Sequence, residues 1–186
     1  MKKTILPVFA LIAIVVVLNS CKLLDKLTQF NVDYSTTFTI PPSSLLGGIG
    51  VPLNVPGSSA DQVTTNSAQT FSNNNTSADH IKSVNLKTLK LTITSPSGKK
   101  FDFLKSAILY ISADGLPKIQ VASIDNIDDA TVGNTINLTP VTADLKDYLI
   151  KSTYTVSETV TTSQNNTDNV DIKADATFLV QGKLLK

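Results

Sequence analysis

Residues 154–161, Tyr-Thr-Val-Ser-Glu-Thr-Val-Thr, and residues 170–180, Val-Asp-Ile-Lys-Ala-Asp-Ala-Thr-Phe-Leu-Val, decide the fold class. In both stretches apolar and polar side chains alternate, which is the period of a β-strand with one buried face. A polar segment from Gln164 to Asn169 separates the two stretches. We therefore predict two long strands that are joined by a polar tip and form an antiparallel hairpin.

The same alternation occurs near the other end of the chain, from Phe30 to Ile40, and predicts a half-buried strand there. Pro41 ends this strand because proline has no N–H to donate to a neighbouring strand. Apolar runs bounded by turn residues predict further strands at residues 64–71, 89–94, 107–112, 118–124 and 135–138. Asp114-Gly115 predicts a tight reversal between the two strands that flank it.

A few segments depart from the strand pattern. Residues 81–86 have apolar side chains at the spacing of one helical turn, and residues 142–149 predict a short helix. The aromatic segment 101–104 predicts an apolar plug on a turn or a short helix. Residues 43–57 are rich in glycine, proline and leucine without a stable period, so we expect a loop.

Short strands at this spacing, about seven to nine in total, are typical of two antiparallel sheets packed face to face. We predict an all-β protein: an antiparallel two-sheet β-sandwich, immunoglobulin-like or jelly-roll, with one or two short helices. A closed antiparallel β-barrel is the alternative. The chain length favours one domain, and we place it at residues 30–186.

The N-terminus has a separate character. Lys2 and Lys3 precede an uncharged apolar run that extends from Ile5 to Leu18. A helix that spans a bilayer needs about 20 apolar residues, so this run is too short for a permanent span. A charged start, a short apolar run and small residues after it are typical of a secretory signal peptide. We therefore assign residues 1–20 to a signal peptide and leave them out of the fold prediction.

The run Leu18-Asn19-Ser20-Cys21 places the only cysteine directly behind that segment. This N-terminus resembles that of a bacterial lipoprotein precursor. The resemblance implies cleavage after Ser20, attachment of a diacylglyceryl group to the Cys21 thiol and acylation of the new amino terminus, for example with palmitate. Two or three acyl chains make a durable anchor. A cleaved signal with an accidental cysteine, or an uncleaved anchor, are the alternatives.

The resemblance also implies a location. Residues 21–29 would be a lipidated tether, and the domain would be held at the bacterial cell envelope, where we expect the outer membrane. The membrane would then be a partner through the lipid on Cys21.

Composition argues against several classes of function. The chain has 16 basic and 15 acidic residues, so no excess of positive charge indicates a nucleic-acid partner. All the basic residues are lysine, and arginine is the side chain that dedicated phosphate or carboxylate sites favour. The chain has no tryptophan, which argues against aromatic sugar-binding platforms. One cysteine allows neither an internal disulfide nor a thiolate metal cluster.

Two single residues are the natural candidates for chemistry. His80 is the only histidine and follows Asp79 beyond an asparagine-rich tip, without a motif of a catalytic triad or a zinc site around it, so we expect an exposed loop histidine. Glu158 is the only glutamate and falls on the apolar side of its predicted strand. We expect it to be an inward-pointing charge on an edge strand that opposes aggregation, and we assign no catalytic residue.

The densest group of oxygen donors is formed by Asp125, Asp128 and Asp129. These carboxylates are the candidates for a calcium site, because calcium prefers oxygen ligands. Their spacing lacks the alternating donors, central glycine and terminal glutamate of an EF-hand. We therefore expect a solvated loop and predict neither a metal nor a cofactor.

The sequence favours a non-catalytic, lipid-anchored protein with a binding or structural role, whose partner is another envelope protein or polymer. Two alternatives stay open: an accessory envelope hydrolase that uses aspartates, and a carrier of a small apolar ligand between the sheets. A cleft lined by several carboxylates would favour the enzyme, and a large apolar cavity would favour the carrier. A filled core with a flat exposed face would favour binding of a macromolecule.

Overall fold

The computed structural model describes residues 28–42, 53–54, 61–163 and 165–183, and it confirms the all-β class. The strands are β1 (Gln29–Ile40), β2 (Leu53–Asn54), β3 (Asp61–Thr64), β4 (Ile81–Ser95), β5 (Leu104–Ala113), β6 (Leu116–Ile124), β7 (Thr135–Pro140), β8 (Thr153–Thr162) and β9 (Val170–Gly182). The helical elements are α2 (Ser67–Asn73), α3 (Lys146–Leu149) and the 3₁₀ turns η2 (Ala78–His80) and η3 (Phe101–Phe103).

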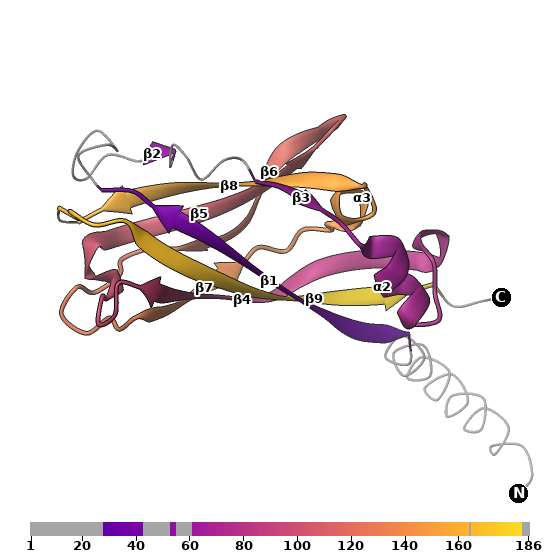
Figure 1. Ribbon diagram of the computed structural model, residues 1–186. Coiled ribbons are helices and arrows are strands. Elements are labelled where there is room, and N and C mark those ends of the chain that lie inside the picture. Colours follow the sequence, from indigo (N-terminus) through magenta and orange to yellow (C-terminus); the bar gives the residue numbers. More distant parts are fainter. Residues whose placement is uncertain (1–27, 43–52, 55–60, 164, 184–186) are drawn as a thin grey trace, which may run out of the picture.

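The strands form two layers (Figure 1). One layer has the order β1, β9, β4 and β7, and the other contains β6, β5 and β8, with the short β2 and β3 on the outer side of β8. All the pairings are antiparallel. Facing sheets pack at about 10 Å, so inward side chains from both layers share one interior.

β7 joins the two layers at one side. Residues 135–138 of β7 pair with β4, whereas Thr139 and Pro140 pair with β6. A strand that changes partners in this way forms the corner between two packed sheets. The two ends of the strand order, β1 and β2, are not paired with each other in the described residues, so the sheet curls without closing there.

The interior contains two groups of buried apolar side chains. The larger group includes Ile40, η3 and the inward residues of both layers, and the smaller one joins Phe71 of α2 to Ile81, Val84 and Val180. The members of both groups lie between Phe30 and Val180. The folded unit therefore contains its whole described core without the first 21 residues. None of the helices in the described residues has the length and apolar character needed to cross a membrane.

Most predicted strands are confirmed, but the hairpin of residues 154–180 is wrong. β8 pairs with β5, β2 and β3, whereas β9 pairs with β1 and β4 in the other layer. The polar segment between them crosses from one layer to the other. It is fixed there by Asn166, whose Nδ2 donates to the Asp168 carbonyl, and by the Ser163 amide, which donates to the Phe103 carbonyl.

The helical turn predicted at residues 81–86 is a strand. β4 shifts its register against β9 between Ile81 and Ser83 and again between Leu86 and Thr88. Each β-bulge adds one residue to a strand and moves the following side chains to the opposite face. Buried residues therefore stand three apart at each bulge, from Ile81 to Val84 and from Leu86 to Leu89, which imitates a helical spacing.

Two boundaries around the short helices also differ. The predicted strand at residues 64–71 is replaced by the end of β3 and by α2, which carries Phe71 into the smaller core group. The predicted helix at 142–149 begins only at Lys146. The reason is that Asp144 and Leu145 bond to β4: the Val84 amide donates to Asp144 Oδ1 at 2.9 Å, and the Leu145 amide donates to the Val84 carbonyl at 2.7 Å.

Two local predictions are confirmed. Asp114-Gly115 makes the turn between β5 and β6, and Gly115 has a φ of +73°, a left-handed conformation that glycine adopts without steric cost. Phe101 and Phe103 lie on η3 and are 0% and 1% exposed, which is the predicted apolar plug. The predicted loop at residues 43–57 lies outside the described residues apart from β2.

Candidate functional site

The candidate site lies between the layers, beneath the β1–β9 strand pair. In β1 every second side chain faces inward, and Phe38 and Tyr34 are only partly buried at these positions. Their partners on β9 become small along the strand: Phe38 stands opposite Ile172, whereas Thr36 and Tyr34 stand opposite alanines 174 and 176. Two small side chains in succession leave space between the layers.

A first cavity of about 90 Å³ occupies this space. Its wall is built from both layers and is almost entirely apolar, with Leu89 on β4, Leu109 on β5 and Ala176 on β9 as examples. Such a wall fits an apolar body, because apolar surface loses contact with water when the body binds.

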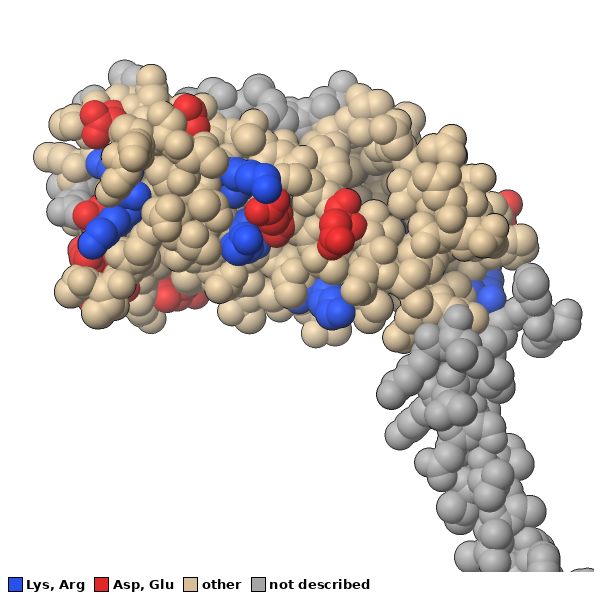
Figure 2. Space-filling view, turned by 60° about the horizontal axis from the view of Figure 1, so that its bottom comes forward, with Lys and Arg blue, Asp and Glu red and all other residues tan. Residues whose placement is uncertain are grey.

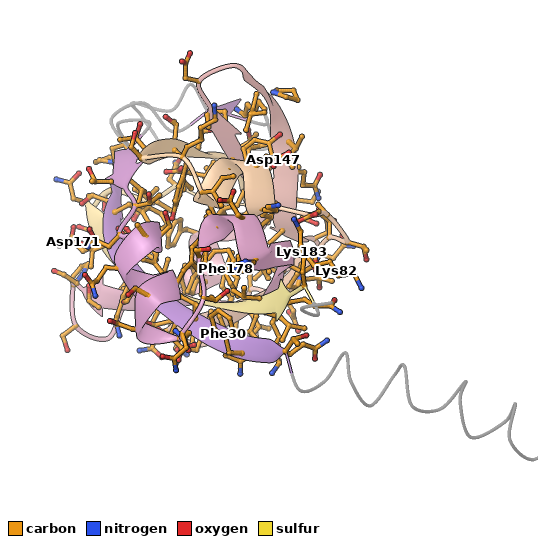
Figure 3. The ribbon with its side chains drawn as sticks, turned by 90° about the vertical axis from the view of Figure 1, so that its right-hand side faces the viewer. Phe30, Lys82, Asp147, Asp171, Phe178 and Lys183 are labelled. Atoms are coloured by element: carbon orange, nitrogen blue, oxygen red, sulfur yellow. The ribbon has the colours of Figure 1, made fainter. Side chains whose placement is uncertain are left out.

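A second cavity of about 230 Å³ lies next to the first, toward α2. The two cavities share four lining residues, Tyr34, Val63, Tyr154 and Phe178. Figure 3 views the molecule from the α2 side, where Phe178 lies between the layers and Phe30 lies near the start of β1. We call the two adjacent cavities together the interlayer cleft.

Glu158 is the acidic residue of the interlayer cleft. It lines the first cavity and is 7% exposed. The prediction of an inward direction is confirmed, but the prediction of an edge strand is wrong, because β8 has β5 on one side and β2 and β3 on the other. The Glu158 carboxylate therefore lies in the interior and is not a charge on an edge strand that prevents aggregation.

Two phenols lie where the cavities meet. Burial raises the pKa of Tyr154, and the nearby Tyr34 phenol raises it further. The Tyr154 hydroxyl therefore stays protonated at every pH at which a protein of this kind works. Together with Tyr34 it supplies phenol groups at the border of the almost entirely apolar first cavity.

His80 lies away from the interlayer cleft. It ends η2, is exposed as predicted, and its Nδ1 lies 3.1 Å from Ser77 Oγ. A serine and a histidine three residues apart in one exposed turn lack the buried acid that orients a catalytic histidine. The contact between Ser77 and His80 therefore belongs to the local structure of the turn.

The aspartates proposed for calcium serve the local loop structure. Asp128 accepts hydrogen bonds from the Ala130 amide and the Thr131 hydroxyl, and Asp129 accepts one from Ser163. Within the described part of the chain, no three histidine, cysteine, aspartate or glutamate side chains are gathered so that they could hold a metal ion, and this includes Asp125. The structure therefore does not bring the three carboxylates together.

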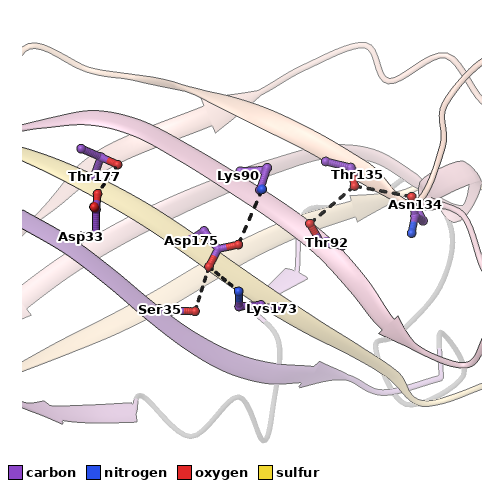
Figure 4. Close-up of polar contacts among 9 residues, drawn as sticks. All are labelled: Asp33, Ser35, Lys90, Thr92, Asn134, Thr135, Lys173, Asp175 and Thr177. Atoms are coloured by element: carbon purple, nitrogen blue, oxygen red, sulfur yellow. Dashed lines mark hydrogen bonds and ion pairs between the residues drawn. The ribbon is translucent and has the colours of Figure 1, made fainter.

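The outer face behind the interlayer cleft is polar. Figure 2 shows a small group of lysines and acidic residues in the middle of this face and further charged residues toward its left-hand end. Asp175 accepts a hydrogen bond from Ser35 at 2.9 Å and contacts Lys173 Nζ at 2.9 Å, as Figure 4 shows. The Thr177 hydroxyl donates to Asp33 at 2.7 Å. The Ser35–Asp175 and Asp33–Thr177 contacts join β1 to β9.

The predicted lipid attachment at Cys21 and the predicted cleavage after Ser20 lie outside the described residues. The sequence did not locate the interlayer cleft, although a carrier was one of its alternatives. The signal that could have found it is the change along β9 from Ile172 to Ala174 and Ala176 at successive inward positions.

Comparison with protein-family models gives no match, and comparison with curated proteins gives no significant match. Among solved structures, a chain described as Desmodium yellow mottle tymovirus is similar at 10% identity over 85% of this chain and 84% of that chain, with a TM-score of 0.22. A likeness at this level carries no argument about the activity of the chain.

Proposed function

We propose that this chain is a lipid-anchored protein of the bacterial cell envelope with a non-catalytic binding role, and that the interlayer cleft is its ligand site. The observation that carries the proposal is the pair of adjacent cavities between the layers, of which the first is almost entirely apolar. Largely preformed apolar cavities with few polar groups are the usual form of a small-molecule site. Of the functions considered, carriage of a small apolar ligand fits this geometry best.

The interlayer cleft lies close to the end of the domain that would be attached to the membrane. The second cavity is lined by Val32 and Asp33, which lie only a few residues from the start of β1. Residues 22–27 would then be the only link between a lipid on Cys21 and the described domain. A fully extended chain spans at most 3.3–3.6 Å per residue, so these six residues could bridge a distance of about 20 Å. The larger cavity would stay near the bilayer, where apolar molecules are concentrated.

The arrangement of the carboxylates favours binding over hydrolysis. Hydrolysis of a glycosidic bond needs two carboxyl groups on either side of the bond. In the described residues that line the interlayer cleft, Glu158 belongs to the first cavity and Asp33 to the second, and Asp33 Oδ1 accepts a hydrogen bond from Thr177 on the outer face. This speaks for a ligand that is held and released unchanged.

The binding test uses residues 22–186, which contain the whole described core, and N-phenyl-1-naphthylamine, an apolar dye that fluoresces when it leaves water. We expect saturable fluorescence with the unmodified chain. Ala176→Leu should fill the first cavity and weaken dye binding at least tenfold. Thr88→Leu, which adds an apolar side chain on an exposed position of β4, is the matched control and should bind the dye unchanged. A dye affinity that Ala176→Leu leaves unchanged would contradict the proposal that the interlayer cleft is the ligand site.

The anchor is tested separately on the full-length chain. Mass spectrometry of the protein from bacterial membranes should find Cys21 as the first residue with diacylglyceryl and acyl groups attached. Cys21→Ser should abolish both the cleavage after Ser20 and the incorporation of labelled palmitate. An intact leader or an unmodified thiol in the natural protein would contradict the anchor.

A further inference from the structure

The interlayer cleft contains a buried carboxylate that an apolar ligand alone does not explain. Glu158 lies on the inner side of β8, opposite Leu109 of β5, and faces the first cavity. Its neighbours at the inward positions of β8 are Val160, which is buried, and Val156, which is partly buried and lines the same cavity. Among the described residues that line the first cavity, it is the only acidic or basic side chain.

A carboxylate in such surroundings restricts what can share the cavity with it. Moving an ionised carboxylate out of water is costly, and the cost is lowered when a hydrogen-bond donor or a positive charge comes close. A carboxylate offers about four lone-pair sites, so it can accept a bond from a ligand in addition to bonds within the protein. A ligand carboxylate in the same apolar space would lose its own hydration and would be repelled by an ionised Glu158, because the effective dielectric constant is low there.

The space around the carboxylate fits a head group better than a whole ligand. The first cavity is about 90 Å³, and the second, which Glu158 does not line, is about 230 Å³. The two cavities meet at four residues that line both of them, Tyr34, Val63, Tyr154 and Phe178. A ligand that places a small polar end beside Glu158 would therefore extend its apolar body through this junction toward Phe71 of α2.

We infer that Glu158 selects the head group of the ligand: the interlayer cleft accepts slender apolar molecules that end in a hydrogen-bond donor, an amine or a hydroxyl group, and rejects those that end in a carboxylate. This inference rests on the proposed function and adds the ligand class to it. The selection acts through repulsion of the wrong head group as much as through attraction of the right one.

The test measures how decylamine, decanol and decanoate, which have the same apolar body, displace N-phenyl-1-naphthylamine from residues 22–186. We expect decylamine and decanol to displace the dye, and decanoate to be at least tenfold weaker than either. Residues 22–186 contain 14 lysines and 15 acidic residues, because Lys2 and Lys3 are removed, so their net charge is about −1 and non-specific attraction of amines is small. Glu158→Gln keeps the shape of the side chain and replaces the carboxyl group by an amide, which cannot ionise. In this variant, the concentrations of decylamine and decanoate that displace half of the dye should differ by no more than about threefold.

The controls separate this inference from the proposed function. Asp175→Asn removes a carboxylate from the outer face of β9 and should leave the order of the three ligands unchanged. Equal displacement by all three ligands on the unmodified chain would overturn the inference and leave the interlayer cleft in place as a binding site. The same holds if Glu158→Gln folds and keeps the preference. Failure of the dye itself to bind would overturn the proposed function. The comparison on the unmodified chain decides the matter even if Glu158→Gln does not fold.

Discussion

The two ends of the sandwich differ in how completely their layers meet. At the end that contains η3, Phe101 and Leu104 are 0% exposed and Ile172 of β9 packs in the same core group. At the α2 end, Tyr34 and Phe178 are only partly buried and line cavities. The same two layers therefore make a filled core at one end and a cleft at the other.

The course of β1 and the size of the β9 side chains explain the difference. β1 runs obliquely across the sandwich in Figure 1, and at its C-terminal end Ile40 is 1% exposed. In the middle of β1, Thr36 and Tyr34 stand opposite alanines 174 and 176 of β9, and the Tyr34 ring is only partly buried and does not fill the space beside them. The comparison teaches that the interlayer cleft results from specific small residues and not from generally loose packing.

The largest effect should come from removing one aromatic ring from each end. Phe103→Ala should cost about 3–5 kcal/mol of unfolding free energy, because it empties a fully packed site. Phe178→Ala, the matched change in the interlayer cleft, should cost about 1–2 kcal/mol, since its ring is partly exposed and borders existing space. Urea unfolding of both variants measures the difference. Equal losses would show that the two ends are packed alike.

The filled end could be predicted from the sequence, for a physical reason. Its elements carry strong local signals: the alternation that ends at Ile40 and the aromatic cluster at 101–104 each depend on neighbouring residues alone. Periodicity and turn chemistry are local properties, and they determine which side chains face inward.

The cleft end could not be predicted in the same way. Its form depends on which strands become neighbours, and β8 and β9, which look like a hairpin in the sequence, lie in different layers. The bulges of β4 hide its strand character behind a helical spacing at residues 81–86. The sequence did show that Glu158 points inward, but the neighbours of β8 decide that the residue is buried in a cavity and not at an edge.

A second pair of variants adds volume instead of removing it. Ala122 of β6 is 0% exposed, so Ala122→Val should force its neighbours apart and cost about 1–3 kcal/mol. Ala176→Val adds the same atoms next to the first cavity and should change stability by less than about 0.5 kcal/mol. Thermal melting of the two variants under identical conditions tests this. A large loss for Ala176→Val would mean that the cavity does not exist in solution.

A smaller effect separates stability from binding. The Tyr148 hydroxyl on α3 donates to the Pro117 carbonyl at 2.8 Å, outside both cavities. Tyr148→Phe should therefore cost about 1 kcal/mol, because the carbonyl loses its partner while the ring keeps its packing. The affinity for N-phenyl-1-naphthylamine should stay the same. A loss of dye binding in step with this loss of stability would indicate that the dye reports global loosening and not the interlayer cleft.

The smallest effect concerns the polar outer face behind the interlayer cleft, and it depends on pH. Hydrogen bonds from Lys173 and Ser35 lower the pKa of Asp175 below its usual value of 3.8. A carboxyl group whose pKa is lower in the folded state stabilises the fold at pH values above its pKa in the unfolded chain. It loses this contribution as the pH falls through its pKa in the folded state.

Asp175→Asn should therefore lower the melting temperature slightly at pH 6, by less than Tyr148→Phe does. The difference in melting temperature from the unmodified chain should shrink below pH 3.8. Asp168→Asn, at the surface ion pair with Lys99 near η3, is the matched control for the filled end. A difference for Asp175→Asn that grows as the pH falls would show that the contacts between β1 and β9 on this face do not favour the charged carboxylate.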